Sequence, residues 1–306
     1  MTAPTSPAAF DYLEAFSRNL GLVTEEEQRR LRDTRVCIAG LGGVGGAHAL
    51  ALARLGVGRF SLADFDRFEI VNMNRQLGAT ATSLGRPKVD VLAEMITAVN
   101  PDADLRLFPE GLREDNADVF LAGGDVAIDG IDFFGMPARR LLFRAARERG
   151  VYAMTAAPVG FGATIHLFSP TGMTFEEYFD IRDGMGPAEQ LVQFGLGLAP
   201  RMLQQGYFPP RALDLANGRT PSLGSACLLA SVLVATEVAN LVLRRRPARP
   251  APYFLQFDPL AARYATGWLW RGNRNPIQRA KRWWVLRTNP QLRRLIEQTR
   301  TANATA

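Results

Sequence analysis

Short apolar runs alternate with longer segments of helical periodicity through the first half of the chain. Arg35–Ala39 is such a run and stops at glycines, which is typical of a buried parallel strand. Further runs predict strands over Phe60–Ala63, Leu105–Phe108, Val126–Ile128, Val151–Thr155 and Gly162–Phe168. Helical spacing predicts helices over Asp11–Asp33, Ala47–Leu55, Lys88–Val99 and Pro137–Arg149. This alternation predicts βαβ units and therefore a Rossmann-like, doubly wound α/β fold, with a mostly parallel sheet and helices on both faces.

The second half is less regular and predicts a C-terminal extension of that fold. Thr171–Gly218 is rich in Gly and Pro and has few clear periods. Ser222–Leu243 predicts a long apolar helix, and because it contains Glu237 and Asn240 we favour a buried core helix over a membrane span. After it come a candidate last strand, Tyr253–Phe257, and a tail of helical pieces broken at Pro276 and Pro290.

The tail holds most of the positive charge. Between Arg271 and Arg300 the chain has nine Arg or Lys residues and one acid, Glu297. Their net charge of +8 leaves −2 for the rest of a chain of 306 residues whose total is +6. Trp283 and Trp284 lie among these cations. The tail therefore fits binding to nucleic acid, attachment to a membrane surface, or docking on a partner protein or second subunit.

Cysteine usage indicates a reducing compartment. The chain has only Cys37 and Cys227, so we expect no disulfide framework and a cytoplasmic location. The lead Met1–Ala9 lacks the charged and apolar regions of a secretion signal.

Glycines follow the first predicted strand and precede a helix, in the order Gly40-Leu-Gly42-Gly43-Val-Gly45-Gly46. Glycines in this place let backbone N–H groups approach a pyrophosphate at the positive end of a helix. Asp64, at the end of the next strand, is placed to bind ribose hydroxyls. These features fit an NAD(P)-dependent oxidoreductase as well as an enzyme that uses ATP.

The polar residues further along favour ATP. A hydrogen-bonding Asn and two cations suit a triphosphate, and a carboxylate at a strand end suits Mg²⁺, whereas a nicotinamide site needs a flat apolar surface. The polar set consists of Asp64, Asp66, Asn72, Arg75, Gln76, Lys88, Asn100, Asp129 and Asp132.

Taken together, these motifs resemble the ThiF/MoeB/HesA adenylyltransferases, which are relatives of the ubiquitin-activating enzymes. The motifs are Gly-x-Gly-Gly-x-Gly, Asp-x-Asp, Asn-x-x-Arg-Gln, Gly-x-x-Lys, Asn-Pro and Asp-x-x-Asp. The resemblance covers Phe16 to about Phe168 and resumes over Gly224–Asp258.

The resemblance implies a role for each matching residue. Gly40, Gly42, Gly43 and Gly45 would line the phosphates and adenosine, and Asp64 would hold the ribose. Asn72, Arg75 and Lys88 would bind phosphates, and Asp132 would be the Mg²⁺ carboxylate. Arg18 would act in trans on the partner's site, which implies a homodimer. Three alternatives stay open: Asp66 as a turn cap rather than a nucleotide contact, Asp129 as structural support, and Arg18 as a surface cation.

The chain departs from ubiquitin-activating relatives in its cysteines. Cys37 falls inside a strand and Cys227 inside a helix, so we expect no thioester step. No Cys-x-x-Cys pair occurs, and we expect no zinc. The expected product is an acyl-adenylate of a small carrier protein, a peptide, a modified tRNA or a metabolite. An NAD(P)-dependent oxidoreductase and a non-catalytic nucleotide-binding subunit are the alternatives.

The expected organisation has four parts. Residues 1–34 form an N-terminal helical segment that contacts the second subunit, and residues 35–169 the ATP-binding domain. Residues 170–260 complete the fold on the substrate and dimer side, where Thr171–Gly218 is either an aromatic substrate cover or a packing insertion. Residues 261–306 form the basic tail.

Overall fold

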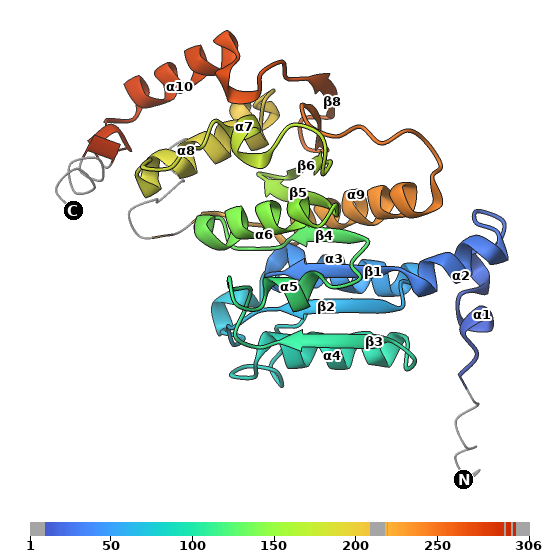
Figure 1. The fold of residues 1–306 in the computed structure, drawn as a ribbon. Helices are drawn as coiled ribbons and strands as arrows, with labels where there is room; N and C mark the ends of the chain where they lie inside the picture. Colours follow the sequence, from blue (N-terminus) through green and yellow to red (C-terminus); the bar gives the residue numbers. More distant parts are fainter. Residues whose placement is uncertain (1–9, 209–217, 219, 291, 295, 298–306) are drawn as a thin grey trace.

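The computed structural model describes residues 10–208, 218, 220–290, 292–294 and 296–297. The lead Met1–Ala9 and the last residues of the basic tail lie outside these ranges. In the described part, eight strands form one sheet in the order β3-β2-β1-β4-β5-β6-β7-β8 (Figure 1). The strands are β1 (Arg35–Ala39), β2 (Arg59–Ala63), β3 (Asp104–Phe108), β4 (Val126–Asp129), β5 (Tyr152–Val159), β6 (Gly162–Phe168), β7 (Tyr253–Asp258) and β8 (Arg263–Trp268).

The sheet changes from parallel to antiparallel at β6. Strands β1 to β5 pair in parallel, because helical crossovers return the chain to the same edge before each new strand. Strands β6, β7 and β8 then add in antiparallel register. The predicted Rossmann-like, mostly parallel α/β fold is confirmed.

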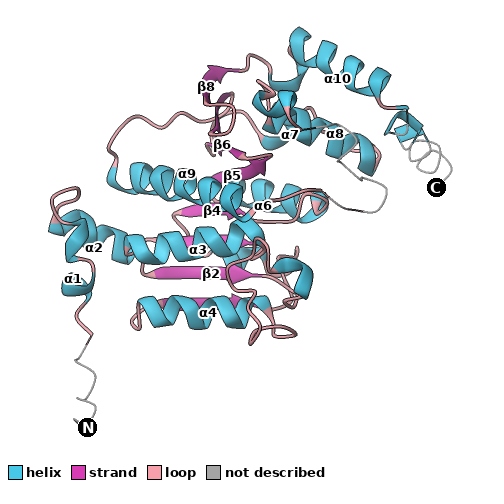
Figure 2. Cartoon of the chain, turned by 180° about the vertical axis from the view of Figure 1, so that it is seen from behind, coloured by secondary structure: helices cyan, strands magenta, loops and turns pink. Residues whose placement is uncertain are grey.

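Helices cover both faces of the sheet. α3, α4 and α9 pack on one face, and α5, α6, α7 and α8 on the other (Figure 2). The helices are α1 (Tyr12–Ala15), α2 (Glu25–Asp33), α3 (Gly43–Leu55), α4 (Lys88–Val99), α5 (Ala117–Leu121), α6 (Met136–Glu148), α7 (Phe175–Phe179), α8 (Pro187–Leu198), α9 (Gly224–Leu243) and α10 (Pro276–Thr288). The short 3-10 turns are η1 (Ser17–Asn19), η2 (Ile70–Asn72), η3 (Leu203–Gly206) and η5 (Gly272–Arg274).

The apolar helix α9 is long enough to cross a membrane, but it packs against α3, β5 and β6. Its inward residues Ala230, Val234 and Val238 are fully buried, as the core-helix interpretation requires. Leu228 and Val232 on its outer side are 47% and 59% exposed. α9 therefore presents an uncovered apolar strip beside its buried face.

One helix prediction was wrong. Asp11–Asp33 is not one helix, because Gly21 adopts a φ of +102° and a new helix starts at Thr24, whose side chain caps α2. The tail is divided at Pro276 as predicted: η5 ends before it, and Pro276 occupies the first position of α10, where a missing N–H costs nothing.

The irregular segment Thr171–Gly218 contains more structure than its sequence predicts. Thr174 forms a capping box that starts α7, and α8 follows with Pro187 at its first position. The sequence also failed to predict β8, an edge strand whose residues are mostly exposed and so lack apolar alternation.

Candidate functional site

The polar motifs gather where the strand order of the sheet reverses. Ala39 at the end of β1 pairs with Ala63 of β2 on one side and with Asp129 of β4 on the other, so the three strands end level. The crossovers after β1 and β4 leave in opposite directions along the sheet. In open parallel sheets this reversal opens a crevice outside the carboxyl ends, where ligands bind.

The glycine loop, residues 40–46, fills one side of this crevice. Gly40 has a φ of +85°, which favours glycine. A Cβ on Gly45 would lie 1.8 Å from the Gly40 carbonyl oxygen, and a Cβ on Gly40 would lie 2.4 Å from the Gly130 oxygen. At Gly42 the nearest atom is the Gln76 Nε2, at 3.6 Å. At Gly40 and Gly45 the missing side chains let the backbones that follow β1 and β4 approach each other, whereas a Cβ on Gly42 would make only an ordinary contact with Gln76.

The first turn of α3 is free to bind an anion. Gly42 is its N-cap, and among the residues that the structure describes no side chain accepts a hydrogen bond from its first N–H groups. Acids are also absent from that turn. The unpaired N–H groups and the helix dipole therefore make the electrostatic potential in the crevice positive, which favours an anion.

Asp64 secures the glycine loop from the end of β2. Its carboxylate accepts hydrogen bonds from the Leu41 N–H at 2.6 Å and from the Asp66 N–H at 2.8 Å. Burial raises the pKa of the Asp64 carboxyl, and the charge of Lys88 and these two N–H groups partly offset the rise. The carboxylate retains acceptor capacity beyond these two bonds.

Lys88 lies close to both acids of the Asp-x-Asp motif. Its ammonium is almost buried and forms an ion pair with the Asp66 carboxylate at 2.8 Å. The Lys88 N–H also donates to the Asp66 carbonyl. Asp66 thus partners Lys88, and its side chain makes no turn-capping hydrogen bond.

The Asn-x-x-Arg-Gln motif lies over the glycine loop. Asn72 is buried and its Oδ1 accepts from the Glu69 N–H. The aliphatic part of Arg75 lies against Gly43, with Cγ 3.5 Å from the position of a Cβ there. Its guanidinium donates to the Val71 carbonyl at 2.9 Å. The stem of Arg75 is therefore at the loop, while its charged end turns back on its own segment.

Gln76 is a site residue that sequence reasoning named only within a motif. Its side chain is buried beside Gly42, and its Oε1 has no hydrogen-bond partner among the described residues. A buried amide oxygen without a donor is costly, so a water or a donor group of a ligand would satisfy it. Only the tertiary contact with Gly42 reveals this role.

Asp132 follows β4 and faces solvent at the same edge. Its Oδ1 accepts from the Phe134 N–H at 3.0 Å, and Oδ2 has no partner among the described residues. Gly130, two residues earlier, packs against Gly40 and Gly45. The loop that carries Asp132 is thus joined to the glycine loop.

Asp129 supports this loop through an ion pair that the sequence did not predict. The Arg139 Nε donates to the Asp129 carboxylate at 2.7 Å, and both side chains are fully buried. The same guanidinium donates to the carbonyls of Ile131 and Asp132 at 2.6 and 3.0 Å. It also lies 4.4 Å from the centre of the Phe194 ring on α8. The structural interpretation of Asp129 fits these contacts.

Arg18 is the one predicted site residue that lies away from the others. It is exposed in a groove of about 570 Å³ beside Leu50 and Arg54, in the C-terminal half of α3. That is roughly 10 Å along the helix axis from the glycine loop. Arg18 is therefore separated from the glycine loop of its own chain.

Both cysteines lie inside the protein, where their thiols are harder to ionise. Cys37 and Cys227 are both buried, and burial raises the pKa of Cys37 to about 11 and raises that of Cys227 as well. The Cys227 sulfur lies near Gly43 but at the closed side of the loop. Within the described ranges, no three His, Cys, Asp or Glu side chains are grouped to hold a metal ion.

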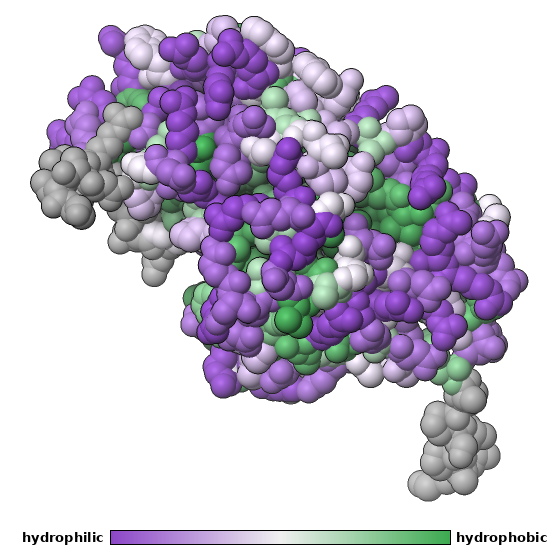
Figure 3. All heavy atoms as spheres, viewed as in Figure 1, coloured by the Kyte–Doolittle hydropathy of each residue, from purple (hydrophilic) through white to green (hydrophobic). Residues whose placement is uncertain are grey.

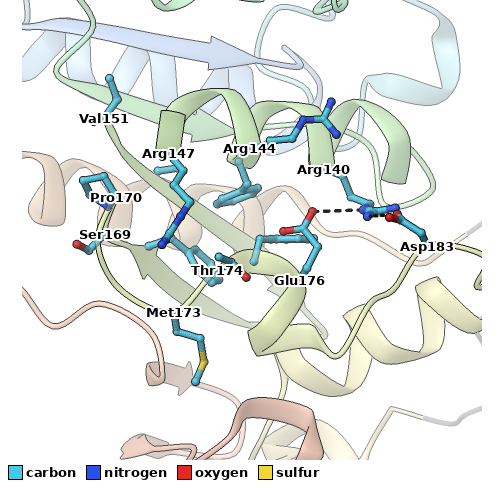
Figure 4. A pocket seen from close by; sticks show the side chains of 14 residues that line it. Arg140, Arg144, Arg147, Val151, Ser169, Pro170, Met173, Thr174, Glu176 and Asp183 are labelled. Atoms are coloured by element: carbon cyan, nitrogen blue, oxygen red, sulfur yellow. Dashed lines mark hydrogen bonds and ion pairs between the residues drawn. The ribbon is translucent and has the colours of Figure 1, made fainter. Parts of the chain in front are cut away.

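A second pocket, of about 300 Å³, lies on the outer side of α6 (Figure 4). Arg140, Arg144 and Arg147 border it, and Arg140 forms ion pairs with Glu176 and Asp183. None of the residues predicted for the nucleotide site lines it.

Comparisons with known proteins agree on one family. A model described as the ThiF family matches residues 16–271. The chain is 39% identical over 121 residues to the tRNA threonylcarbamoyladenosine dehydratase of Bacillus subtilis (strain 168), covering 39% of this chain and 48% of that protein. It is 34% identical over 157 residues to the sulfur carrier protein ThiS adenylyltransferase of Escherichia coli (strain K12), covering 51% and 62%.

The matches thus span about half to three fifths of these relatives' own length. A crystal structure of the E. coli tRNA N6-threonylcarbamoyladenosine dehydratase in complex with ATP has a similar fold. Its TM-score is 0.55 at 20% identity, over 76% of this chain and 95% of that one.

Proposed function

The chain belongs to the ThiF family, and from this premise we propose that it is a Mg²⁺- and ATP-dependent adenylyltransferase. An oxygen of a substrate carboxylate attacks the α-phosphorus of ATP, the bond from that phosphorus to the bridging oxygen breaks, and pyrophosphate leaves. The product is an acyl-adenylate. The observation that carries the proposal is the meeting of the uncapped α3, Asp64 and Asp132 at the reversal of the strand order.

The glycine loop and α3 would hold the phosphates of ATP. Gly42 leaves room for them, and the free N–H groups of the first turn of α3 donate to their oxygens. The Asp64 carboxylate would accept hydrogen bonds from the ribose hydroxyls, because the two bonds from the Leu41 and Asp66 N–H groups do not use all of its acceptor capacity. The unpaired Oε1 of Gln76 would accept a hydrogen bond from a hydroxyl or amino group of the nucleotide or from a water bound to it.

Two cations and an amide would align the triphosphate. Lys88 needs only to exchange its exposed partner Asp66 for a phosphate oxygen. Arg75 needs only a rotation of its charged end, because its stem already lies against Gly43. Asn72 would hold the segment between them through its bond to the Glu69 N–H. Such alignment supplies much of the catalysis in phosphoryl chemistry.

Asp132 would hold the magnesium ion. Its exposed carboxylate has a free oxygen, and Mg²⁺ is usually bound by one or two carboxylates together with substrate phosphates and water. A single carboxylate beside a phosphate site fits that donor set. Bound there, the ion would neutralise charge on the phosphate oxygens.

A homodimer would complete the site. Arg18 lies away from the glycine loop of its own chain, so its proposed contact with ATP would be made at the site of a second subunit. Ile70, Val71 and Met73 are 72%, 65% and 46% exposed, and their segment is tied to the start of α9 by the Asn74–Ser222 hydrogen bond. Together with Leu228 and Val232 they form an apolar surface suited to a second copy of the chain.

The substrate would be a carboxylate on a small carrier protein, a peptide, a modified tRNA or a metabolite. The relatives named above concern a sulfur carrier protein and a tRNA. Because both cysteines are buried and hard to ionise, the acyl group would pass from the adenylate without a thioester step. Two free cysteines in a chain of this length also support a cytoplasmic location.

The test is ATP–pyrophosphate exchange with candidate carboxylates, run on the wild type and on Asp132→Asn. We expect exchange with one of the candidates and a loss of about 100-fold or more in the variant, since a preorganised electrostatic contact is removed. Asp183→Asn is the matched control, because this exposed acid lies by the remote pocket on α6. It should exchange like the wild type.

Three results would contradict the proposal. ATP binding without exchange for any class of carboxylate would favour a non-catalytic nucleotide-binding subunit. Saturable binding of NADH or NADPH in competition with ATP would favour an oxidoreductase. Full exchange by the Asp132→Asn variant would show that the Asp132 carboxylate does not hold the magnesium ion.

A further inference from the structure

The segment after β7 carries positive charge without any acid. From residue 259 to residue 296 the chain has nine Arg or Lys residues and no Asp or Glu. Most of it lies beyond residue 271, where the match to the family ends. α10 forms its centre and lies beyond the antiparallel end of the sheet, at the top of Figure 1. Its charge therefore needs an explanation outside the adenylylation site.

The inner side of α10 uses part of this charge to dock on the body. Arg282 forms an ion pair with Glu189 of α8 at 2.5 Å, and Lys281 donates to the Pro200 carbonyl. Val285 and Leu286 pack with Leu292 and Ile296 against α8. Val285 and Leu286 are thus turned inward, and these contacts fix the position of α10.

The outer side keeps cations that no acid neutralises. Arg279, Trp283 and Arg287 recur every fourth residue, so they form one stripe along the helix. Trp283 is 61% exposed, and the Arg287 guanidinium lies 5.3 Å from its ring centre. In the part of the chain that the structure describes, Arg279 and Arg287 have no acidic partner.

A second pair of the same kind lies just before α10. The Arg271 guanidinium is 5.3 Å from the ring centre of Trp270, which is 56% exposed. The Asn275 side chain caps α10 and donates to the Trp270 carbonyl, which holds this pair at the start of the helix. Cation and indole therefore recur together along the segment.

We propose that the outer face of α10, formed by Arg279, Trp283, Trp284 and Arg287, binds single-stranded nucleic acid. Exposed indoles give a face for unpaired bases to stack on, and neighbouring arginines neutralise the phosphates. A membrane-bound helix would need a continuous apolar face instead. On α10, Val285 and Leu286 face α8, and the exposed Ile277, Trp283 and Trp284 are interrupted by cations. The surface over the helix is therefore mostly hydrophilic (Figure 3).

The test measures binding of the full chain to a fluorescein-labelled oligouridine of about 12 nucleotides by fluorescence anisotropy. Repeating the titration from about 50 to 200 mM KCl gives the salt slope. Arg279→Gln/Arg287→Gln should reduce that slope by roughly 1.4, since each phosphate contact to a single strand contributes about 0.7. Trp283→Ala should weaken binding about 5-fold to 100-fold, and Trp283→Phe should restore most of the loss.

The control is Arg29→Gln/Arg30→Gln, which removes two exposed arginines from α2 and should leave affinity and slope unchanged. Circular dichroism checks that each variant is folded. The assay contains neither ATP nor a carboxylate, so its outcome is independent of the adenylylation proposed above.

Several outcomes would overturn the inference. These are no binding at the lowest salt, equal binding by the wild type and the Trp283→Ala variant, and tighter binding of a duplex of the same length. Binding to vesicles containing phosphatidylserine without binding to oligouridine would assign the face to a membrane surface instead.

Discussion

The buried ion pair between Asp129 and Arg139 offers the sharpest test of how the site is built. The Asp129 and Arg139 side chains are 1% and 3% exposed, so water does not screen their interaction. Arg139→Met removes the charge partner of Asp129 and the donors to the carbonyls of Ile131 and Asp132. Removing one partner of a buried pair costs about 3–5 kcal/mol, and we expect a loss of stability in that range.

The double variant should separate stability from function. In Asp129→Leu/Arg139→Met neither charge remains, and replacing both partners of a buried pair by apolar residues is often neutral. We expect stability within about 1–2 kcal/mol of the wild type, and a coupling energy of several kcal/mol from the cycle. ATP–pyrophosphate exchange should still fall, because the loop that carries Asp132 has lost the donors that Arg139 supplied.

The assay is urea unfolding followed by tryptophan fluorescence, with exchange measured on the same samples. Arg29→Met is the comparison, since Arg29 and Glu25 form an exposed pair that should contribute no more than about 1 kcal/mol. If Arg139→Met cost no more than Arg29→Met, the buried pair would not support the fold as argued. If the stable double variant kept full exchange, Arg139 would have no part in placing Asp132.

Two further predictions concern a close backbone contact and two buried histidines. Gly45→Ala should lower the free energy of unfolding by about 3 kcal/mol and abolish ATP binding, because its Cβ would meet the Gly40 carbonyl oxygen at 1.8 Å. The control is Gly42→Ala, whose Cβ would lie 3.6 Å from the nearest atom; it should lower the free energy of unfolding, measured by thermal unfolding, by less than about 1 kcal/mol. Burial lowers the pKa of His48 and His166 to about 3, so the unfolded chain binds more protons and stability is lost as pH falls from 6.5 toward 3. His48→Gln should therefore flatten the stability–pH profile by about 1.4 kcal/mol per pH unit near pH 5, and an unchanged slope would show that His48 titrates in the folded state.

The fold could be predicted from the sequence because its signals are local. Short apolar runs that stop at glycines identify β1 and its parallel neighbours, and helical spacing identifies α4 to the residue. The nearness of most of the predicted site residues to one another also followed from this reasoning, because parallel strands that end level bring their following residues to one edge. Thus the places of Gly40, Asp64 and Asp132 depend on topology, which the alternation of elements predicts.

What the sequence failed to predict depends on contacts between distant segments. Gln76 matters because Gly42 lies beside its amide, and Arg18 is separated from the other site residues because α1 and η1 pack at the far end of α3. The edge strand β8 exists because β7 offers it hydrogen bonds, although its own residues lack the usual alternation. None of these relations is a property of a local window of sequence.

Arg139 shows where a signal was present and went unused. Along α6, Met136, Arg139, Phe143 and Ala146 recur at helical spacing, so Arg139 lies on the buried stripe of the helix, whereas Arg140 is turned outward. A guanidinium on an apolar stripe is stable only if a buried carboxylate and carbonyls receive its hydrogens. The acid nearest in the chain that ends a buried strand is Asp129. The pattern therefore specified both partners of the ion pair. The buried cation Arg139 indicates that Asp129, at the end of the preceding strand, supports the loop, and that Asp132 is the acid left available to a ligand.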